Sequence, residues 1–305
     1  MSQMPDSYLS YAWRDYGQDH GFYDWQLAHA REPLRWQDGT EVAVCLIVPV
    51  EFFSLNPSGA PFKHPGAMAT PYPDLRHYTV RDYGNRVGIY RILDTLKKQD
   101  CLACFAINGE VTRRYPPLLK AIKTAEHEII AHSVSTDHIH HEAMTADEER
   151  AIIKETLSSF DEPPLGWMSP ARNQSSRTPS LLAEAGLTYM LDWEMDQRPV
   201  TFATEHGQIT AIPNHYELSD FTLLHTRRQT EDSWSQQIKT AITQLKGEYE
   251  RYGTQMLGLT LTPYIIGQPF RIQALQDLLQ HMASLDGVSI CTAQHIHDAY
   301  QKAQP

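Results

Sequence analysis

The stretch Val42-Ala43-Val44-Cys45-Leu46-Ile47-Val48-Pro49-Val50 decides the fold, and a single acid, Glu51, follows it directly. An apolar run of this length, rich in β-branched residues, predicts a buried strand of a parallel sheet. Other short apolar runs recur along the chain, and each ends in polar residues or leads towards them. These runs are 102–107, 128–131, 187–191, 209–212 and 257–261.

Segments with a helical spacing of apolar residues separate these runs, so the sequence predicts an α/β fold with about seven parallel strands. Residues 52–80 are rich in proline and read as a long irregular loop, which in a compact domain is usually functional. The expected helices cover 83–98, 111–125, 145–159, 178–186, 233–252, 271–284 and 293–303, and a last strand covers 288–291.

Functional groups in α/β folds gather where the strands end at their carboxyl side. Glu51 follows the first strand, His132 the strand at 128–131, and Asp192 the strand at 187–191. Asp220 comes after the strand at 209–212, and Thr262 directly follows the strand at 257–261. We therefore expect one mouth of the fold to collect these five side chains.

The composition limits the classes of protein to which the chain can belong. Of its 305 residues 41% are hydrophobic, enough for a sizeable core, and no apolar run is long enough to span a membrane. The formal net charge of −11 disfavours nucleic acid and anionic membranes as partners. The N-terminus does not resemble a secretory signal and the chain has only 4 cysteines, so we expect a cytoplasmic protein. Cys101 and Cys104 have the spacing of a redox or zinc pair, but we interpret them as small apolar residues that enter a buried strand.

Residues 1–40 are interpreted as an N-terminal arm, and residues 41–305 as one domain. Exposed apolar area of the size of this arm usually marks an interface. We therefore predict a homodimer or homotetramer that buries part of the arm, with packing of the arm on its own domain as the alternative. The aromatic residues of the arm are Tyr8, Tyr11, Trp13, Tyr16, Phe22, Tyr23 and Trp25.

Several motifs, in this order and spacing, resemble the polysaccharide deacetylase (NodB-homology) family. More narrowly, they resemble its branch of metal-independent allantoinases and cyclic-imide hydrolases. The resemblance covers nearly the whole chain, and it implies a deformed (β/α) barrel. The motifs are Arg81-Asp82-Tyr83-Gly84-Asn85-Arg86-Val87-Gly88, His127-Glu128-Ile129-Ile130-Ala131-His132-Ser133, Gly166-Trp167-Met168-Ser169-Pro170, Thr178-Pro179 with the segment to Gly186, Asp192-Trp193, and Pro263-Tyr264 with the segment to Ile272.

The metal-dependent members of that family place two acids in succession after the first strand and two histidines four residues apart in the second motif. This chain has Glu51-Phe52 at the first place, and His132 with Thr136 at the second. Phenylalanine cannot bind a metal, and a lone threonine hydroxyl is a poor ligand. We therefore expect no metal and no other cofactor.

The resemblance also implies roles for single residues. Glu51 matches the general base, and His132 is expected to orient the substrate carbonyl or to protonate the leaving nitrogen. Met168 replaces an arginine that pairs with the base, a place that Arg172 could reach, and Thr262 replaces a histidine that serves as general acid. The residues expected to bind substrate are Arg81, Arg86, Trp167, Ser169, Arg172, Asp192, Trp193, His215, Asp220 and Thr262.

The leading hypothesis is a metal-independent hydrolase that acts on a non-peptide carbon–nitrogen bond of a small amide, ureide or imide. A second hypothesis is an N-deacetylase that keeps its metal through substitute ligands, His138 or His140. A third is a catalytically inactive family member that binds a ligand or supports a partner protein, because the departures at Phe52, Thr136 and Thr262 are unusual for an active deacetylase.

Overall fold

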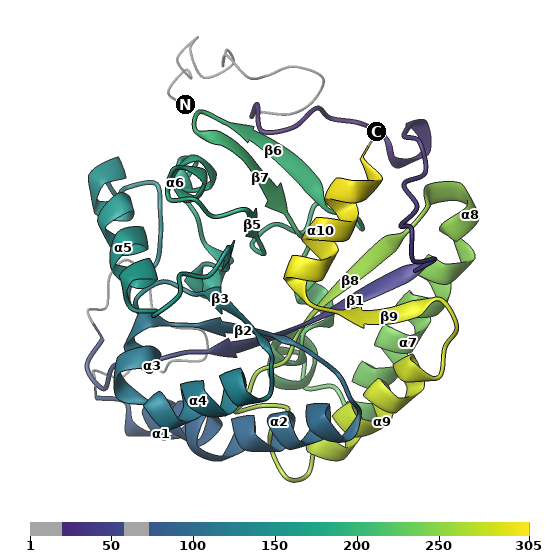
Figure 1. Cartoon of the computed structure of the whole chain (residues 1–305). Helices are drawn as coiled ribbons and strands as arrows, with labels where there is room; N and C mark the ends of the chain where they lie inside the picture. The colour runs from purple at the N-terminus through teal and green to yellow at the C-terminus, as the bar shows by residue number, and fades with distance from the viewer. Residues whose placement is uncertain (1–19, 58–72, 305) are drawn as a thin grey trace, which may run out of the picture.

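The computed structural model describes residues 20–57 and 73–304, and these form a curled, mostly parallel sheet with helices packed around it (Figure 1). The order of the strands in the sheet is β6-β7-β5-β4-β3-β2-β1-β8, and β9 also pairs with β1. The curled sheet confirms the predicted deformed barrel. The strands are β1 (Val42–Val50), β2 (Cys104–Ile107), β3 (Glu128–Ala131), β4 (Gly166–Trp167), β5 (Tyr189–Met190), β6 (Val200–Thr204), β7 (Gly207–Ala211), β8 (Gln255–Thr260) and β9 (Val288–Cys291).

The first strand lies at the centre of this arrangement. One run of β1, 42–47, pairs with β8, while its end, 47–50, pairs with β2 and its start, 42–45, with β9. The expected number of strands was too low. The described residues contain 9 strands, among them β6, which is antiparallel to β7 and which the sequence analysis missed. Only Phe202 of β6 is fully buried, as is typical of a hairpin strand at the edge of a sheet and not of a buried parallel strand.

The expected helices are present, but 111–125 and 233–252 are each divided into two helices, and the helix near residue 83 has different bounds. The expected helix 83–98 begins earlier, at Leu75, because Asp74 caps it by accepting a hydrogen bond from the backbone N–H of His77 at 3.0 Å. Part of the expected loop 52–80 is therefore helical, and residues 58–72 of that loop lie outside the described residues. The helices are α1 (Leu75–Tyr83), α2 (Ile89–Lys98), α3 (Gly109–Arg114), α4 (Pro116–Thr124), α5 (Ala146–Ser158), α6 (Thr178–Glu184), α7 (Glu231–Gly247), α8 (Tyr249–Tyr252), α9 (Ile272–Ala283) and α10 (Ala293–Ala303), with a π-helical segment, Gly84–Gly88, between α1 and α2.

Successive residues of β1 point into two different cores. Val44, Leu46 and Val48 pack in the larger core, to which α2, α7 and α9 contribute. Cys45 and Ile47 pack in the smaller core, to which α10 contributes. A strand that is buried on both faces has no solvated side, which explains why 42–50 is a continuous apolar run and not an alternating one.

A carboxylate of β3 binds the N-terminus of α10 beside the smaller core. Glu128 at the start of β3 accepts hydrogen bonds from the backbone N–H of Gln294, at 3.2 Å, from the thiol of Cys104, at 2.8 Å, and from the hydroxyl of Tyr189. The Cys104 and Cys101 thiols are both free and buried, so the described structure agrees with their interpretation as small core residues.

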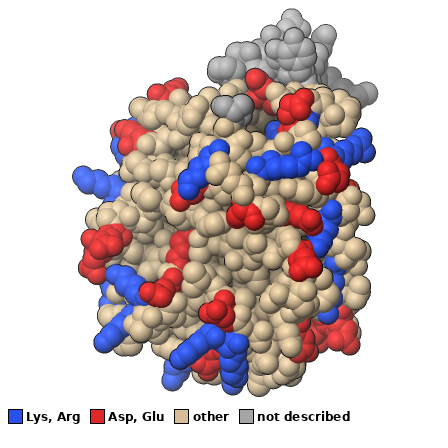
Figure 2. All heavy atoms as spheres, turned by 45° about the vertical axis from the view of Figure 1, so that its right-hand side comes forward, with Lys and Arg blue, Asp and Glu red and all other residues tan. Residues whose placement is uncertain are grey.

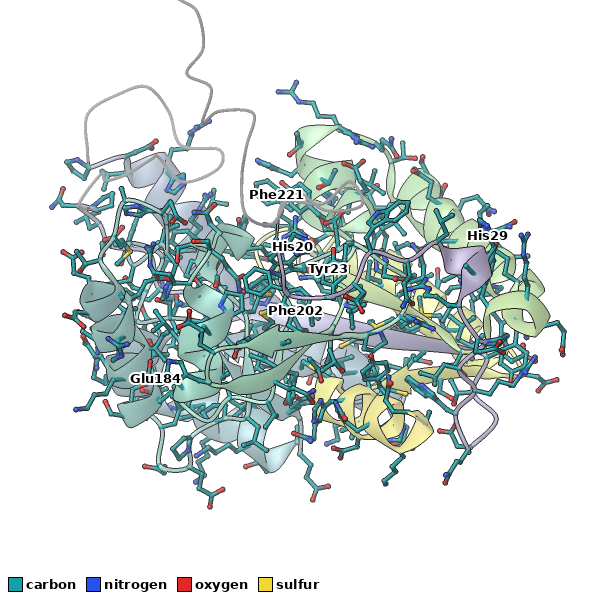
Figure 3. All side chains as sticks on the ribbon, turned by 90° about the horizontal axis from the view of Figure 1, so that it is seen from above. His20, Tyr23, His29, Glu184, Phe202 and Phe221 are labelled. Carbon is teal, nitrogen blue, oxygen red and sulfur yellow. The ribbon has the colours of Figure 1, made fainter. Side chains whose placement is uncertain are left out.

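The described part of the N-terminal arm, residues 20–40, packs on its own domain. Phe22 stacks on Phe202 of β6 with ring centroids 5.2 Å apart, and its carbonyl accepts a hydrogen bond from the backbone N–H of Ala203 at 2.8 Å. Figure 3 shows His20, Tyr23 and Phe202 grouped together. Trp25 keeps 52% of its surface exposed. Of the aromatic residues that motivated the predicted oligomer, Tyr8, Tyr11, Trp13 and Tyr16 lie outside the described residues.

The surface gives limited information about partners. Acidic and basic side chains are interspersed over the face in Figure 2, without a continuous basic patch there. Within residues 20–57 and 73–304, no helix has both the length and the apolar character that crossing a bilayer requires.

Candidate active site

A cavity of about 390 Å³ opens at the carboxyl ends of β1, β3, β4 and β8. This is the mouth that the sequence analysis expected, and six of the predicted site residues line it. They are Glu51, Arg81, His132, Ser169, Arg172 and Thr262. The other lining residues are Pro49, Phe53, Thr136, Ile139, Met168, Pro170, Ala171, Asn214, Tyr216, Ser219, Phe221, Thr260 and Tyr264.

Glu51 and His132 meet in the cavity although 81 residues separate them in the chain. Their nearest atoms, Glu51 Oε1 and His132 Nε2, are 3.4 Å apart. His132 Nδ1 lies 2.6 Å from the carbonyl oxygen of Met168, which can only accept a hydrogen bond, so Nδ1 carries a proton. His132 Nε2 is therefore the ring nitrogen that faces the carboxyl group of Glu51.

Two asparagines that the sequence analysis did not select hold this pair in place. Asn108, fully buried after β2, accepts a hydrogen bond from the backbone N–H of Phe52 at 2.8 Å and donates one to the carbonyl of His132. Asn85 donates to the carbonyl of Glu51 at 2.7 Å. The position of Asn108 at the end of a predicted strand was the available signal, but its partners lie on strands far away in sequence.

The donor set does not fit the metal of the metal-dependent family members. Phe52 has no ligand atom, and the hydroxyl of Thr136 donates to the carbonyl of Phe52 at 3.0 Å. His138 contacts Ser135, and His140 pairs with the buried Glu149 at 2.9 Å, and neither histidine lines the cavity. Among residues 20–57 and 73–304, no group of three or more His, Cys, Asp and Glu is placed to hold a metal ion.

The two arginines of the cavity are stacked on aromatic rings. The Arg81 guanidinium lies between the rings of Phe53 and Tyr264, 4.8 and 4.9 Å from their centroids. Stacking of this kind restrains a guanidinium and keeps its N–H groups directed sideways. Arg81 is nearly buried, so it sets a fixed positive charge at the cavity wall.

Arg172 does not reach the place beside Glu51 that the sequence analysis suggested. It binds Glu194 at 2.6 Å and the carbonyl of Asn214 at 2.9 Å, and it stacks on Tyr216. The reason is the backbone, since Arg172 has a left-handed φ of 54° that turns the residue away from the strand end. Its pairing with Glu194 leaves little net charge at that side of the cavity.

Two buried acids lie directly behind cavity residues. Asp192 accepts hydrogen bonds from the backbone N–H of Ser169 at 2.7 Å and from its hydroxyl at 2.9 Å. Asp220 accepts from the backbone N–H of Thr262 at 2.7 Å and from its hydroxyl at 2.8 Å. Burial raises the pKa of both carboxyl groups, that of Asp220 to about 7. Neither acid lines the cavity, so each can act on a substrate only through the hydroxyl residue in front of it.

The remaining predicted site residues lie away from the cavity lining. Trp167 is fully buried and donates to the hydroxyl of Ser169 at 2.8 Å. Trp193 packs edge-on against Phe202, and His215 accepts from the backbone N–H of Gly258 at 3.0 Å. Arg86 is exposed on the π-helical segment, where it pairs with Asp82 at 3.3 Å.

Residues 78–190 match the family model described as "Polysaccharide deacetylase". The chain contains a polysaccharide deacetylase domain. A Schizosaccharomyces pombe protein assigned to the polysaccharide deacetylases is 23% identical over 264 residues, which cover 79% of this chain and 82% of that protein. A peptidoglycan deacetylase of Helicobacter pylori is 21% identical over 73% of this chain and 87% of its own length. The crystal structure of the allantoinase PuuE has the same fold, with a TM-score of 0.76, 22% identity, and coverage of 97% of this chain and 99% of that one.

The match of residues 78–190 to the polysaccharide deacetylase model confirms the predicted resemblance, and together with the allantoinase of the same fold it supports a hydrolase of non-peptide carbon–nitrogen bonds. The matched region, 78–190, includes His132 and Ser169 but not Glu51 or Thr262. Glu51 and Thr262 nevertheless line the same cavity as His132.

Proposed function

We propose that this chain hydrolyses a non-peptide carbon–nitrogen bond in a small amide, ureide or imide, and that it does so without a metal ion. The observation that carries the proposal is the Glu51–His132 pair in the cavity, with Phe52 and Thr136 at the two positions where metal ligands would be needed. The allantoinase with the same fold supports a small nitrogen-rich substrate. The cavity of about 390 Å³ has the size of a site for a small molecule.

In this proposal Glu51 accepts a proton from the attacking water. The Glu51 side chain is 19% exposed and lines the cavity, so water can reach it. His132 is held by Met168 and by its neighbour Asn108, so Nε2 faces both Glu51 and the space where the substrate carbonyl would lie. With a proton on Nε2, His132 stabilises the oxyanion that forms as water attacks.

The stacked Arg81 adds a second positive group to this wall. Its guanidinium, stacked between Phe53 and Tyr264, holds a positive charge at the cavity wall, and a fixed charge of this kind stabilises developing negative charge without a large reorganisation of the protein. The proposal therefore assigns activation of the carbonyl to His132 and Arg81, which takes the place of a Lewis acid.

The test is a panel of small amides, ureides and imides, assayed with and without a chelator. We expect at least one class to be hydrolysed, with turnover unchanged by the chelator and less than one transition metal per chain by elemental analysis. One tightly bound transition metal per chain, whose removal abolishes turnover, would contradict the metal-independent mechanism.

Glu51→Gln tests the base directly, because glutamine keeps the shape of the side chain and cannot accept the proton. We expect turnover to fall by about 10²–10⁴, with a free energy of unfolding within about 1 kcal/mol of the wild-type value. Glu217→Gln is the matched control, since Glu217 is an exposed acid that pairs with Arg227 outside the cavity. Near-native turnover of Glu51→Gln would reject Glu51 as the base. Unfolding of the variant would favour the catalytically inactive, ligand-binding alternative.

We also propose a homodimer or homotetramer in the cytoplasm. Trp25 and Leu27 of the arm are 52% and 46% exposed, and such apolar groups are suited to an interface. All 4 cysteines are free, as is usual in a reducing compartment. Light scattering at micromolar concentration tests the assembly, and a monomer of 34.8 kDa would contradict it.

A further inference from the structure

The cavity has a proton acceptor in Glu51, but a leaving nitrogen also needs a proton donor. The family's general-acid position is occupied here by Thr262, whose hydroxyl alone is far too weak an acid at neutral pH. Behind Thr262 lies the fully buried carboxyl group of Asp220, which contacts its hydroxyl at 2.8 Å and its backbone N–H at 2.7 Å. Thr262 therefore separates a buried acid from the cavity by a single hydroxyl group.

The serine and threonine hydroxyls that line the cavity donate their protons to acceptors of the protein. Thr136 donates to the carbonyl of Phe52, and Ser219 donates to that of Tyr216. The remaining cavity hydroxyls donate to side-chain oxygens, as follows: Thr260 to Asn214, Ser169 to Asp192, and Thr262 to Asp220. In this state these hydroxyls can only accept hydrogen bonds from a substrate.

Protonation of Asp220 reverses the direction of the hydrogen bond between its carboxyl group and the hydroxyl of Thr262. Because the backbone N–H of Thr262 occupies Oδ2 of Asp220, a proton on the carboxyl group belongs on Oδ1, where it donates to the hydroxyl oxygen of Thr262. The hydroxyl proton of Thr262 is then free to turn into the cavity. The other carbonyl and amide acceptors of the cavity hydroxyls cannot make this exchange, since they carry no proton to give.

The similar pair of Asp192 and Ser169 is less suited to proton donation. Asp192 also accepts from Gln174, and the hydroxyl of Ser169 is further occupied by the N–H of Trp167. Burial raises the pKa of Asp192, but the charge of His132 opposes the rise. Burial raises the pKa of Asp220 to about 7, against the hydrogen bonds from Thr262 and from the backbone of Phe221 and Ile266.

We propose that Asp220 is the source of the proton for the leaving nitrogen, and that Thr262 is the catalytic residue that delivers it. This inference rests on the proposed hydrolysis. As the carbon–nitrogen bond of the tetrahedral intermediate breaks, the hydroxyl of Thr262 gives its proton to the departing nitrogen and takes the proton of Asp220. The products are a carboxylic acid and the released nitrogen compound, which is an amine from an amide, an amide from an imide and a urea from a ureide. Asp220 is left as a carboxylate that regains a proton from water through Thr262.

The strand order places Thr262 and His132 on opposite sides of Glu51. β1, which ends at Glu51, lies between β8, which leads to Thr262, and β2, beyond which β3 leads to His132. A substrate above Glu51 would thus meet the carbonyl-binding side at His132 and the proton donor at Thr262. Tyr264 lines the same cavity, and its pKa is raised by its burial first and then by Glu51 and Asp220, while Arg81 opposes the rise.

The test compares Asp220→Asn, Thr262→Val and Thr262→Ser on two kinds of substrate. The first is the best amide, ureide or imide of the panel, and the second is p-nitrophenyl acetate, whose leaving group needs no proton at neutral pH. We expect Asp220→Asn and Thr262→Val to lower kcat for the first substrate by about 10²–10⁴, with ester hydrolysis within threefold of wild type. Thr262→Ser keeps the hydroxyl and should retain most of the amide turnover.

The pH profile gives a second readout that a purely structural role would not move. Wild-type kcat should fall as the pH rises through about 7, the pKa of Asp220, and Asp220→Asn should lack this alkaline limb. Asp192→Asn is the matched control, because it changes the other buried acid and should keep the limb. Thermal unfolding of each variant shows that the fold is retained.

Equal losses of amide and ester turnover in Asp220→Asn and Thr262→Val would overturn the proposal, as would an unchanged alkaline limb. If Asp220→Asn does not fold, the comparison of Thr262→Val with Thr262→Ser decides the matter by itself. Wild-type protein that hydrolyses the ester but none of the panel would instead reject the proposed function.

Discussion

Asn108 offers the sharpest test of how the fold positions the site. It is fully buried, and its side chain joins the ends of two strands by accepting from the backbone N–H of Phe52 and donating to the carbonyl of His132. The N–H belongs to Phe52, which directly follows Glu51, and the carbonyl belongs to His132 itself. Replacement of Asn108 by leucine, which has a similar volume, removes both hydrogen bonds and leaves the shape nearly unchanged.

The size of the effect follows from the two groups left without a partner. A buried backbone group that loses its hydrogen bond costs about 1–3 kcal/mol. Asn108→Leu should therefore lower the free energy of unfolding by roughly 2–6 kcal/mol. Turnover should fall as well, because the 3.4 Å contact between Glu51 and His132 depends on the separation of the two strand ends.

The assay is urea unfolding followed by circular dichroism, with turnover measured on the folded variant. Asn85→Ala is the graded control, since it removes only one partly exposed hydrogen bond, to the carbonyl of Glu51, and should cost about 0.5–1.5 kcal/mol. A loss below about 1 kcal/mol in Asn108→Leu would refute the reasoning, because water or a backbone shift would then satisfy both groups.

Three further outcomes are expected. Glu128→Ala should lower the free energy of unfolding by roughly 2–5 kcal/mol in urea, because the N–H of Gln294 and the other donors lose a buried acceptor; an unchanged midpoint would contradict this. The pKa of Asp220 is raised to about 7 from its ordinary 3.8, so the native state holds a proton that the unfolded state releases, and this carboxyl group lowers stability as the pH rises from about 4 to 7. The free energy of unfolding of Asp220→Asn minus that of wild type should therefore rise by roughly 3–5 kcal/mol from pH 4 to pH 8, as measured by unfolding at both pH values. The same difference at both pH values would exclude the raised pKa of Asp220. Gly88→Ala should lower the thermal midpoint, because the added Cβ would lie 2.1 Å from the carbonyl oxygen of Pro263, and such overpacking costs about 1–3 kcal/mol.

The sequence alone determined the elements whose pattern is local. The strand Val42–Val50 was predicted with its observed bounds, and so was Glu128–Ala131. Thr145 and Glu148 form a capping box at the start of α5, where the sequence predicts a helix from residue 145. These features depend on neighbouring residues, on a continuous apolar run or on a side chain that bonds a backbone group three residues away, so they can be read without knowledge of the fold.

The tertiary structure decided which polar groups meet. Nothing local in the chain indicates that Asn108 bonds the backbone beside Glu51, or that Arg172 turns to Glu194. The short strand β4 was not predicted, because its pairing with β3 and β5, and not its own pattern, makes it a strand.

The buried acids show the same division most clearly. The sequence places Asp220 and Thr262 after two different strands, and it predicts for both a place at one mouth. Only the fold sets Asp220 behind Thr262, out of the cavity and in contact with its hydroxyl. Asp220 and its hydrogen-bond partner Thr262 are 42 residues apart in the chain. The burial of the Asp220 carboxyl group and its hydrogen bonds fix its protonation, and therefore its chemistry.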